Sequence, residues 1–129
     1  MEDNVKELDA SNFDEAIRAS DKLVIVEFYN TTCPNCQAIA PTYSELSVEL
    51  EKEAVFTRIN AQRNPSIAAR FGIMGVPTFK FLCQDRPVGE IVGSVHATML
   101  RNTIKDMVRH RTECISKSTR LTFELDGYG

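Results

Sequence analysis

A seven-residue apolar run followed closely by a pair of cysteines limits the folds open to this chain. The run Leu23 to Tyr29 reads LVIVEFY, and Glu27 is its one charged residue. Such a segment is typical of a strand buried on both faces of a helix-covered sheet. Cys33-Pro34 then opens a helix, since proline suits the first helical turn. This helix is expected to reach about residue 51, with apolar residues at helical spacing: Ile39, Tyr43, Leu46 and Leu50.

The rest of the chain alternates between strand-like and helix-like segments. Before the apolar run, we predict a short strand within 4–9 and a helix capped by Ser11 or Asn12 and ending near 20. After the cysteine-bearing helix, we predict a strand at 54–60, a helix at 65–71 ended by Gly72, and a strand at 78–82. A turn at Asp85-Arg86-Pro87 then leads into a strand at 88–93 and a helix at 98–109. This order predicts an α/β fold with a central mixed sheet of about five strands and helices on both faces.

Length and charge exclude several classes of protein. The 129 residues suit one domain, and we assign it to residues 1–111. Lys and Arg number 15 against 18 Asp and Glu, and this net charge of −3 disfavours nucleic-acid binding. No apolar run approaches the ~20 residues of a membrane span. The N-terminus is acidic and lacks an apolar signal core, so we expect a cytoplasmic location, or a lumenal or extracellular one if the chain is an excised domain. We also expect a monomer.

Residues 112–129 form a C-terminal extension whose role the sequence does not reveal. Within it, Ser118 to Asp126 alternates between apolar and polar residues, which is typical of a half-buried strand.

The four cysteines divide into one close pair and two single residues. A structural zinc site needs two close pairs of ligands, so no metal is expected. Cys33 and Cys36 form the close pair. We interpret Cys83 as a small buried or half-buried thiol. Cys114 lies in the extension, where we expect an exposed and inert thiol; an intermolecular disulfide or a regulatory site is the alternative.

A Cys-x-x-Cys pair at a strand-to-helix junction suits thiol–disulfide chemistry. At the helix N-terminus the Cys33 thiolate is favoured by unpaired N–H groups and by the helix dipole. It can then attack a disulfide, and Cys36, one turn later, can resolve the mixed disulfide. Half of a metal site and two unrelated thiols are the alternatives. The preceding buried strand and the following amphipathic helix favour the redox interpretation.

Two further features bear on this chemistry. Glu27 is interpreted as a partly buried acid of raised pKa that exchanges a proton with Cys36. Arg58 is its candidate charge partner, although a solvated strand-end charge is an equal alternative. Pro77 begins a strand, where a trans peptide bond is usual. A cis bond after Val76 would instead leave backbone groups available to a bound peptide.

These motifs together resemble the thioredoxin family, including the catalytic domains of protein disulfide isomerases. The resemblance covers residues 22–108. The matching residues are Val26-Glu27-Phe28-Tyr29, Cys33-Pro34-Asn35-Cys36, Ala40-Pro41, Asn60, Asn64-Pro65, Phe71-Gly72-Ile73, Gly75-Val76-Pro77-Thr78 and Gly93.

The resemblance implies a role for each matching residue. Cys33 would be the attacking thiol and Cys36 the resolving one, with Glu27 as the buried acid. Pro77 would be the cis-proline and Gly93 the glycine near the substrate groove. The partners implied are protein disulfides and a separate reductase that supplies electrons, without a bound cofactor.

The chain also departs from the family pattern around the cysteines. Thr32 stands where thioredoxins usually carry Trp, and the chain has no Trp. Gln37 replaces the usual basic residue, and Glu27 is the acid typical of protein disulfide isomerases. We therefore predict a thiol–disulfide oxidoreductase. A binding or adaptor module with weak turnover, and an oxidase or isomerase domain of a larger secretory-pathway protein, are the alternatives.

Overall fold

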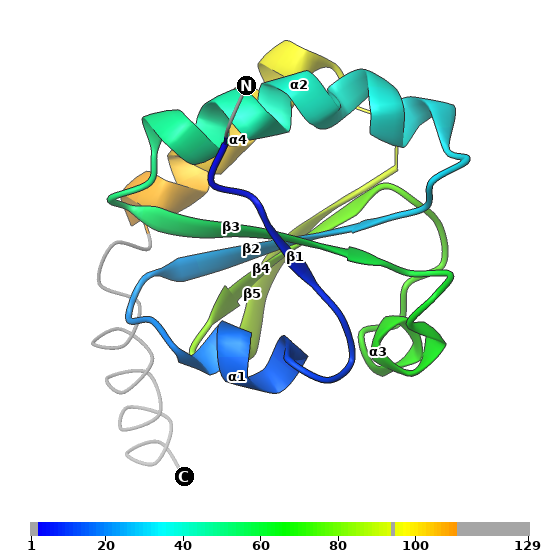
Figure 1. The fold of residues 1–129 in the computed structure, drawn as a ribbon. Helices are drawn as coiled ribbons and strands as arrows, with labels where there is room; N and C mark the ends of the chain where they lie inside the picture. The colour runs from blue at the N-terminus through cyan, green and yellow to red at the C-terminus, as the bar shows by residue number, and fades with distance from the viewer. Residues whose placement is uncertain (1–2, 94, 111–129) are drawn as a thin grey trace, which may run out of the picture.

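The computed structural model describes residues 3–93 and 95–110. Its centre is a five-stranded mixed sheet with strand order β1-β3-β2-β4-β5 (Figure 1). β1, β3 and β2 run parallel, whereas β4 and β5 pair antiparallel. The strands are β1 (Lys6–Leu8), β2 (Leu23–Tyr29), β3 (Ala54–Asn60), β4 (Thr78–Cys83) and β5 (Arg86–Val92). The predicted mixed five-stranded sheet is therefore confirmed.

Helices cover both faces of this sheet, as predicted. α1 (Phe13–Arg18) and α3 (Pro65–Arg70) lie on one face, and α2 (Pro34–Glu49) and α4 (Ala97–His110) lie on the other (Figure 1). Each pair packs on its own cluster of buried side chains. β2 supplies both clusters, because its successive residues point to opposite faces. All seven of its residues are buried, which explains why its sequence is apolar without alternating.

The β4–β5 hairpin turns earlier than predicted. Gln84 and Asp85 both adopt positive φ angles, 51° and 63°. Two such residues form a two-residue turn whose twist matches that of the flanking strands. Arg86 and Pro87 therefore belong to β5. Pro87 is tolerated there because β5 is an edge strand with an irregular register at this point.

The predicted side-chain cap of α1 is also wrong. Asn12 occupies the N-cap position but makes no capping hydrogen bond. Its side-chain oxygen instead accepts a hydrogen bond from the Asp9 N–H at 2.8 Å. The amide is thus used by the loop before the helix, and α1 ends at Arg18 rather than near residue 20.

Within residues 3–93 and 95–110, no helix has the length and apolar character that a bilayer crossing requires. The proposed extension at 112–129, including the strand expected there, lies outside the described residues.

Candidate functional site

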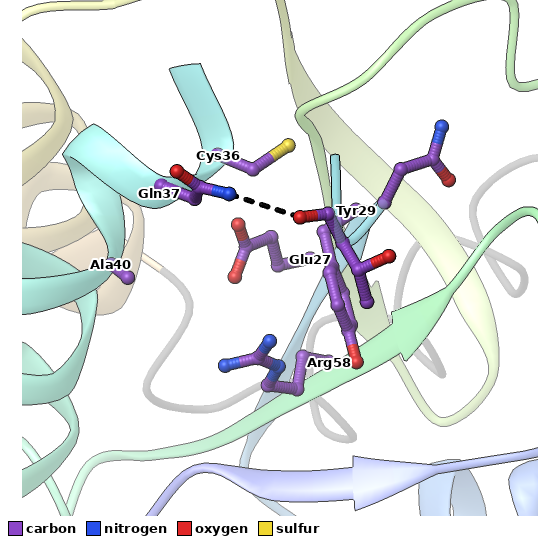
Figure 2. A pocket seen from close by; sticks show the side chains of 8 residues that line it. Glu27, Tyr29, Cys36, Gln37, Ala40 and Arg58 are labelled. Atoms are coloured by element: carbon purple, nitrogen blue, oxygen red, sulfur yellow. Dashed lines mark hydrogen bonds between the residues drawn. The ribbon is translucent and has the colours of Figure 1, made fainter. Parts of the chain in front are cut away.

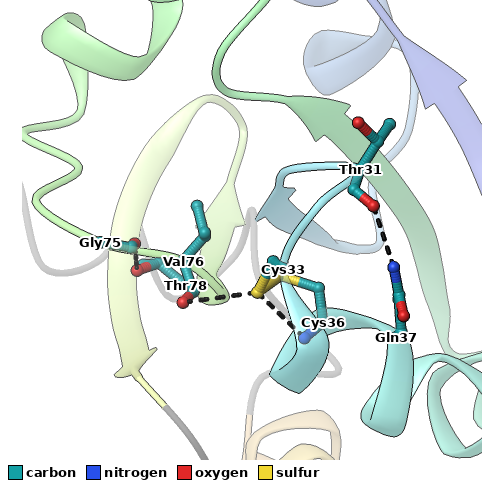
Figure 3. Close-up of a disulfide and its surroundings, with 7 residues drawn as sticks. All are labelled: Thr31, Cys33, Cys36, Gln37, Gly75, Val76 and Thr78. Atoms are coloured by element: carbon teal, nitrogen blue, oxygen red, sulfur yellow. Dashed lines mark hydrogen bonds between the residues drawn. A yellow bond between two sulfur atoms is a disulfide. The ribbon is translucent and has the colours of Figure 1, made fainter.

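The two cysteines meet at the N-terminus of α2. Cys33 is the N-cap residue, in an extended conformation, and Pro34 takes the first helical position. The Cys33 and Cys36 sulfurs form a disulfide, with the Cα atoms 5.2 Å apart (Figure 3). The Cys33 sulfur also accepts a hydrogen bond from the Cys36 backbone N–H at 3.1 Å. A negative charge on this sulfur would be stabilised by that N–H and by the helix dipole.

The two sulfur-bearing residues differ in access. Cys33 is half-buried, whereas Cys36 is only 5% exposed. A protein substrate can therefore approach Cys33 but not Cys36. Thr32, directly before Cys33, is exposed on the turn that connects β2 to α2.

The loop before β4 faces Cys33. The Val76–Pro77 peptide bond is cis, in agreement with the family pattern rather than with the usual trans bond. The carbonyl oxygen of Val76 lies 3.8 Å from the Cys33 sulfur (Figure 3). Val76 is half-buried and Pro77 is buried. Backbone polar atoms and an apolar side chain thus flank the half-exposed sulfur.

Two hydrogen bonds hold this loop in place. The Thr78 hydroxyl donates to the Gly75 carbonyl at 2.7 Å. The Gly93 N–H donates to the Pro77 carbonyl at 2.9 Å, which ties the end of β5 to the loop. Gly93 has a φ of 87°, a conformation that favours glycine. The residues predicted at positions 76, 77 and 93 are therefore neighbours in the structure.

A cavity of about 250 Å³ lies behind Cys36. Figure 2 shows the Glu27 side chain between Cys36 and Arg58 in this space. The Gln37 side chain is directed back onto the loop before Cys33, where its amide donates to the Thr31 carbonyl at 2.9 Å (Figure 3). The lining residues are Glu27, Tyr29, Asn30, Thr31, Cys36, Gln37, Ala40 and Arg58.

Glu27 is an acid held largely out of water. Its exposed fraction is 3%, and burial raises the pKa of its carboxyl group to about 7. The Arg58 charge lowers this pKa and the Glu7 charge raises it, but burial has the larger effect. A group that titrates near neutral pH can both accept and release a proton there.

Arg58 lies in register with Glu27 in the adjacent strand. Its Nε nevertheless lies 3.1 Å from Glu7 Oε1, in an ion pair without hydrogen-bond alignment. Its guanidinium carbon lies 4.0 Å from the centre of the Tyr29 ring. Glu7 was not predicted as a site residue, because only the pairing of β1 with β3 places it opposite Arg58.

The prediction that Cys83 is buried is confirmed, but the prediction that it is a thiol is wrong. Cys83 is 1% exposed within the core on the α2 and α4 face, and its sulfur takes part in a disulfide. The prediction for Cys114 lies outside the described residues. Among the residues that the structure describes, no cluster of three or more His, Cys, Asp or Glu side chains could hold a metal ion.

Comparison with known proteins identifies the family. The model of the family described as Thioredoxin matches residues 4–106. The chain belongs to the thioredoxin family. It is 30% identical over 97 residues to a thioredoxin of Chlorobaculum thiosulfatiphilum, covering 75% of this chain and 90% of that protein. It is 39% identical over 83 residues to the thioredoxin of Staphylococcus haemolyticus, covering 64% and 78%.

Two further relatives extend this comparison. The chain is 29% identical over 119 residues to protein disulfide-isomerase A6 of Mus musculus, covering 85% of this chain but 27% of that protein. The structure of Malassezia sympodialis thioredoxin (Mala s 13) matches with a TM-score of 0.74 at 23% identity, covering 83% of this chain and 93% of the other. This last likeness supports the thioredoxin fold alone. Family membership and the Cys-x-x-Cys pair together support thiol–disulfide oxidoreductase activity in general.

Proposed function

We propose that this thioredoxin-family protein reduces protein disulfides through Cys33 and Cys36. The observation that carries the proposal is the redox pair at the start of α2, in which one cysteine is half-buried and the other is buried beside Glu27. A separate reductase first transfers two electrons and two protons to the disulfide, which gives the dithiol. No bound metal or organic cofactor takes part.

In the first step, the Cys33 thiolate attacks one sulfur of a substrate disulfide. A Cys33–substrate disulfide forms, the substrate S–S bond breaks, and the first substrate sulfur leaves as a thiolate that takes up a proton. The position of Cys33 at the helix N-terminus supports this role, because its thiolate is the nucleophile.

In the second step, Cys36 attacks the Cys33 sulfur of the mixed disulfide. Glu27 accepts the Cys36 proton, the Cys33–Cys36 bond forms, and the second substrate sulfur leaves and is protonated. The substrate has gained two electrons and two protons, and the protein has lost them. The buried carboxyl group with a pKa of about 7 and the shared cavity support this role of Glu27.

The substrate is proposed to bind as an extended segment along the loop before β4. Val76 would supply backbone hydrogen-bonding groups, Pro77 and Gly93 would shape the floor, and Thr32 would contact the substrate from the other side. The 3.8 Å separation of the Val76 carbonyl from the Cys33 sulfur supports this placement. Pairing of a peptide with an exposed backbone is a common recognition mode.

An insulin-reduction assay with dithiothreitol as electron donor tests this proposal. We expect turnover by the wild type and its loss in Cys33→Ser. The Cys36→Ser variant should instead accumulate a mixed disulfide that mass spectrometry detects. Absence of turnover in the wild type would contradict the enzyme proposal and favour a binding or adaptor module. The absence of Trp and the presence of Gln37 after the second cysteine favour that alternative.

Disulfide exchange is the second candidate function. The similarity to protein disulfide-isomerase A6 and the choice of glutamate at position 27 favour it. The equilibrium with reduced and oxidised glutathione separates the two candidates, because a reductant has a lower potential than an isomerase. A reductant also fits the cytoplasm, where we propose that the protein acts as a monomer. An isomerase fits an oxidising lumenal or extracellular compartment.

A further inference from the structure

Three side chains from three neighbouring strands meet beside the Glu27 cavity. Glu7 of β1 pairs in register with Arg58 of β3, and Arg58 pairs with Glu27 of β2. Residues paired in this way project to the same face of the sheet. Tyr29 lies two residues after Glu27 and therefore shares that face. Arg58 consequently lies between two carboxyl groups, one on each neighbouring strand.

The contacts of Arg58 are directed towards one of these two carboxyl groups. Its Nε lies 3.1 Å from Glu7 Oε1, and the Tyr29 hydroxyl donates to Glu7 Oε2 at 2.8 Å. The guanidinium also lies over the Tyr29 ring, 4.0 Å from its centre. Within the described part of the chain, the ion pair of Arg58 is formed with Glu7, and none joins it to Glu27.

Arg58 and Glu7 are the charged residues that shift the pKa of Glu27. The other residues packed around its carboxyl group are as follows. From α2, Cys36 lines the same cavity. Tyr43, also from α2, is buried, and burial raises the pKa of its phenol well above the usual value, so it stays neutral. From β4, the residue paired with Glu27 is Phe79, which carries no charge.

We propose that Glu7 is a positioning residue that, together with Tyr29, holds the Arg58 guanidinium away from the Glu27 carboxyl group. With the cation held by Glu7, the charge of Glu27 is only partly compensated, so the Glu27 carboxyl group binds its proton more tightly than it would if Arg58 acted on it alone. The consequence for catalysis rests on the proposed function, in which Glu27 exchanges a proton with Cys36. The effect of Glu7 on the proton affinity of Glu27 is independent of the proposed function.

The first test is the titration of the Glu27 carboxyl carbon by NMR in the oxidised protein. Glu7→Gln removes the negative charge but keeps an oxygen for the Tyr29 hydroxyl. Because Arg58 then acts on Glu27 alone, we expect the Glu27 midpoint to fall by about 0.5 pH unit or more. Arg58→Met should move the same midpoint in the opposite direction, because the compensating charge is lost.

Asp14→Asn is a matched control. Asp14 pairs with Arg70 at 2.8 Å, and the exposures of these two side chains, 51% and 40%, are close to the 54% and 36% of Glu7 and Arg58. Arg70 also lies over aromatic rings, as Arg58 does. This pair lies between α1 and α3 on the other face of the sheet, so the Glu27 midpoint should not move.

The Glu7→Gln/Arg58→Met double variant tests whether Glu7 acts through Arg58. The effect of Glu7→Gln should be at least halved when Arg58 is absent. An unchanged or raised Glu27 midpoint in Glu7→Gln, or an equal shift in both backgrounds, would overturn the proposal. The pH profile of mixed-disulfide release is then measured in the same variants. A profile that stays constant while the NMR midpoint moves would support the role of Glu7 and contradict the proposed role of Glu27.

Discussion

At the scale of single residues, burial determines the chemistry of Glu27. A carboxyl group in an otherwise apolar strand loses hydration, and its charged form is disfavoured. Arg58 offsets only part of this loss, because Glu7 shares its charge. The same residue that would take part in proton exchange is therefore expected to reduce the stability of the fold when it is ionised.

Replacing Glu27 by Gln should remove a pH-dependent loss of stability. The pKa of Glu27 is about 7 in the folded state against 4.5 ordinarily. Between these values the folded state keeps a proton that the unfolded state has released, so the free energy of unfolding falls as pH rises and levels off above about 7. The loss corresponds to about 3 kcal/mol. Urea unfolding at pH 5 and pH 8 measures most of this loss, and an equal pH dependence in Glu27→Gln would contradict this interpretation.

Gly93 should be needed both for its backbone angle and for its place beside the substrate groove. An added Cβ would meet no atom within 4 Å, so the cost of Gly93→Ala comes from its φ of 87°. We expect a loss of about 1 kcal/mol in the free energy of unfolding. We also expect a higher KM for a peptide disulfide.

Gly72→Ala is the control for this prediction. Gly72 has a φ of 65° and equally open surroundings, but it lies just after the C-terminus of α3 and makes no hydrogen bond to the Pro77 loop. The Gly72→Ala variant should lose a similar amount of free energy of unfolding, but its KM for the peptide disulfide should equal that of the wild type. Equal KM values in the two variants would show that Gly93 has no role in substrate binding.

At the scale of elements, local patterns predicted most of the structure, and the exceptions depend on longer-range contacts. β2 was predicted with its observed bounds, because six of its seven successive residues are apolar, which is typical of a strand buried on both faces. The Cys33–Cys36 pair and Glu27 were found because strand, turn and helix are adjacent in sequence. Glu7 was not found, since its proximity to Arg58 depends on how β1 and β3 pair.

The hairpin turn shows a second limit of local patterns. Gln84 and Asp85 lack the Gly or Asn that usually marks positive φ angles, whereas the neighbouring Pro87 resembles a turn residue. The pairing of β4 with β5 therefore determines where the chain turns, and the local residue preferences do not.

The buried hydroxyl of Tyr43 should contribute to the attachment of α2 to the sheet. Tyr43 is 2% exposed, and its hydroxyl donates to the Thr57 carbonyl at 2.7 Å. Phenylalanine would keep the ring contacts and remove this donor, at an expected cost of about 1 to 2 kcal/mol in urea unfolding. Tyr29→Phe is the comparison. The Tyr29 hydroxyl donates to Glu7, whose half-exposed carboxylate can bind water instead, so we expect a smaller loss in the free energy of unfolding. A larger cost at Tyr29 would contradict this argument.

At the scale of the whole molecule, the sheet has one buried cluster on each face. The first lies under α2 and α4 and includes Ile25 and Ile104. The second lies under α1 and α3 and includes Ile17 and Val24. Adjacent residues of β2 belong to different clusters. Unfolding of one cluster therefore displaces β2, which also removes its side chains from the other cluster. We therefore expect both to unfold in one transition.

Substitutions on opposite faces test this coupling. Ile17 and Ile104 are both fully buried, one under each helical layer. Ile17→Val and Ile104→Val should each lower the free energy of unfolding by about 0.5 to 1.5 kcal/mol. Because the two side chains share no cluster, their effects should add within about 0.5 kcal/mol in the double variant, with an unchanged dependence on urea. Two separate transitions, or a reduced slope in either single variant, would show that the faces unfold independently and that β2 does not couple them.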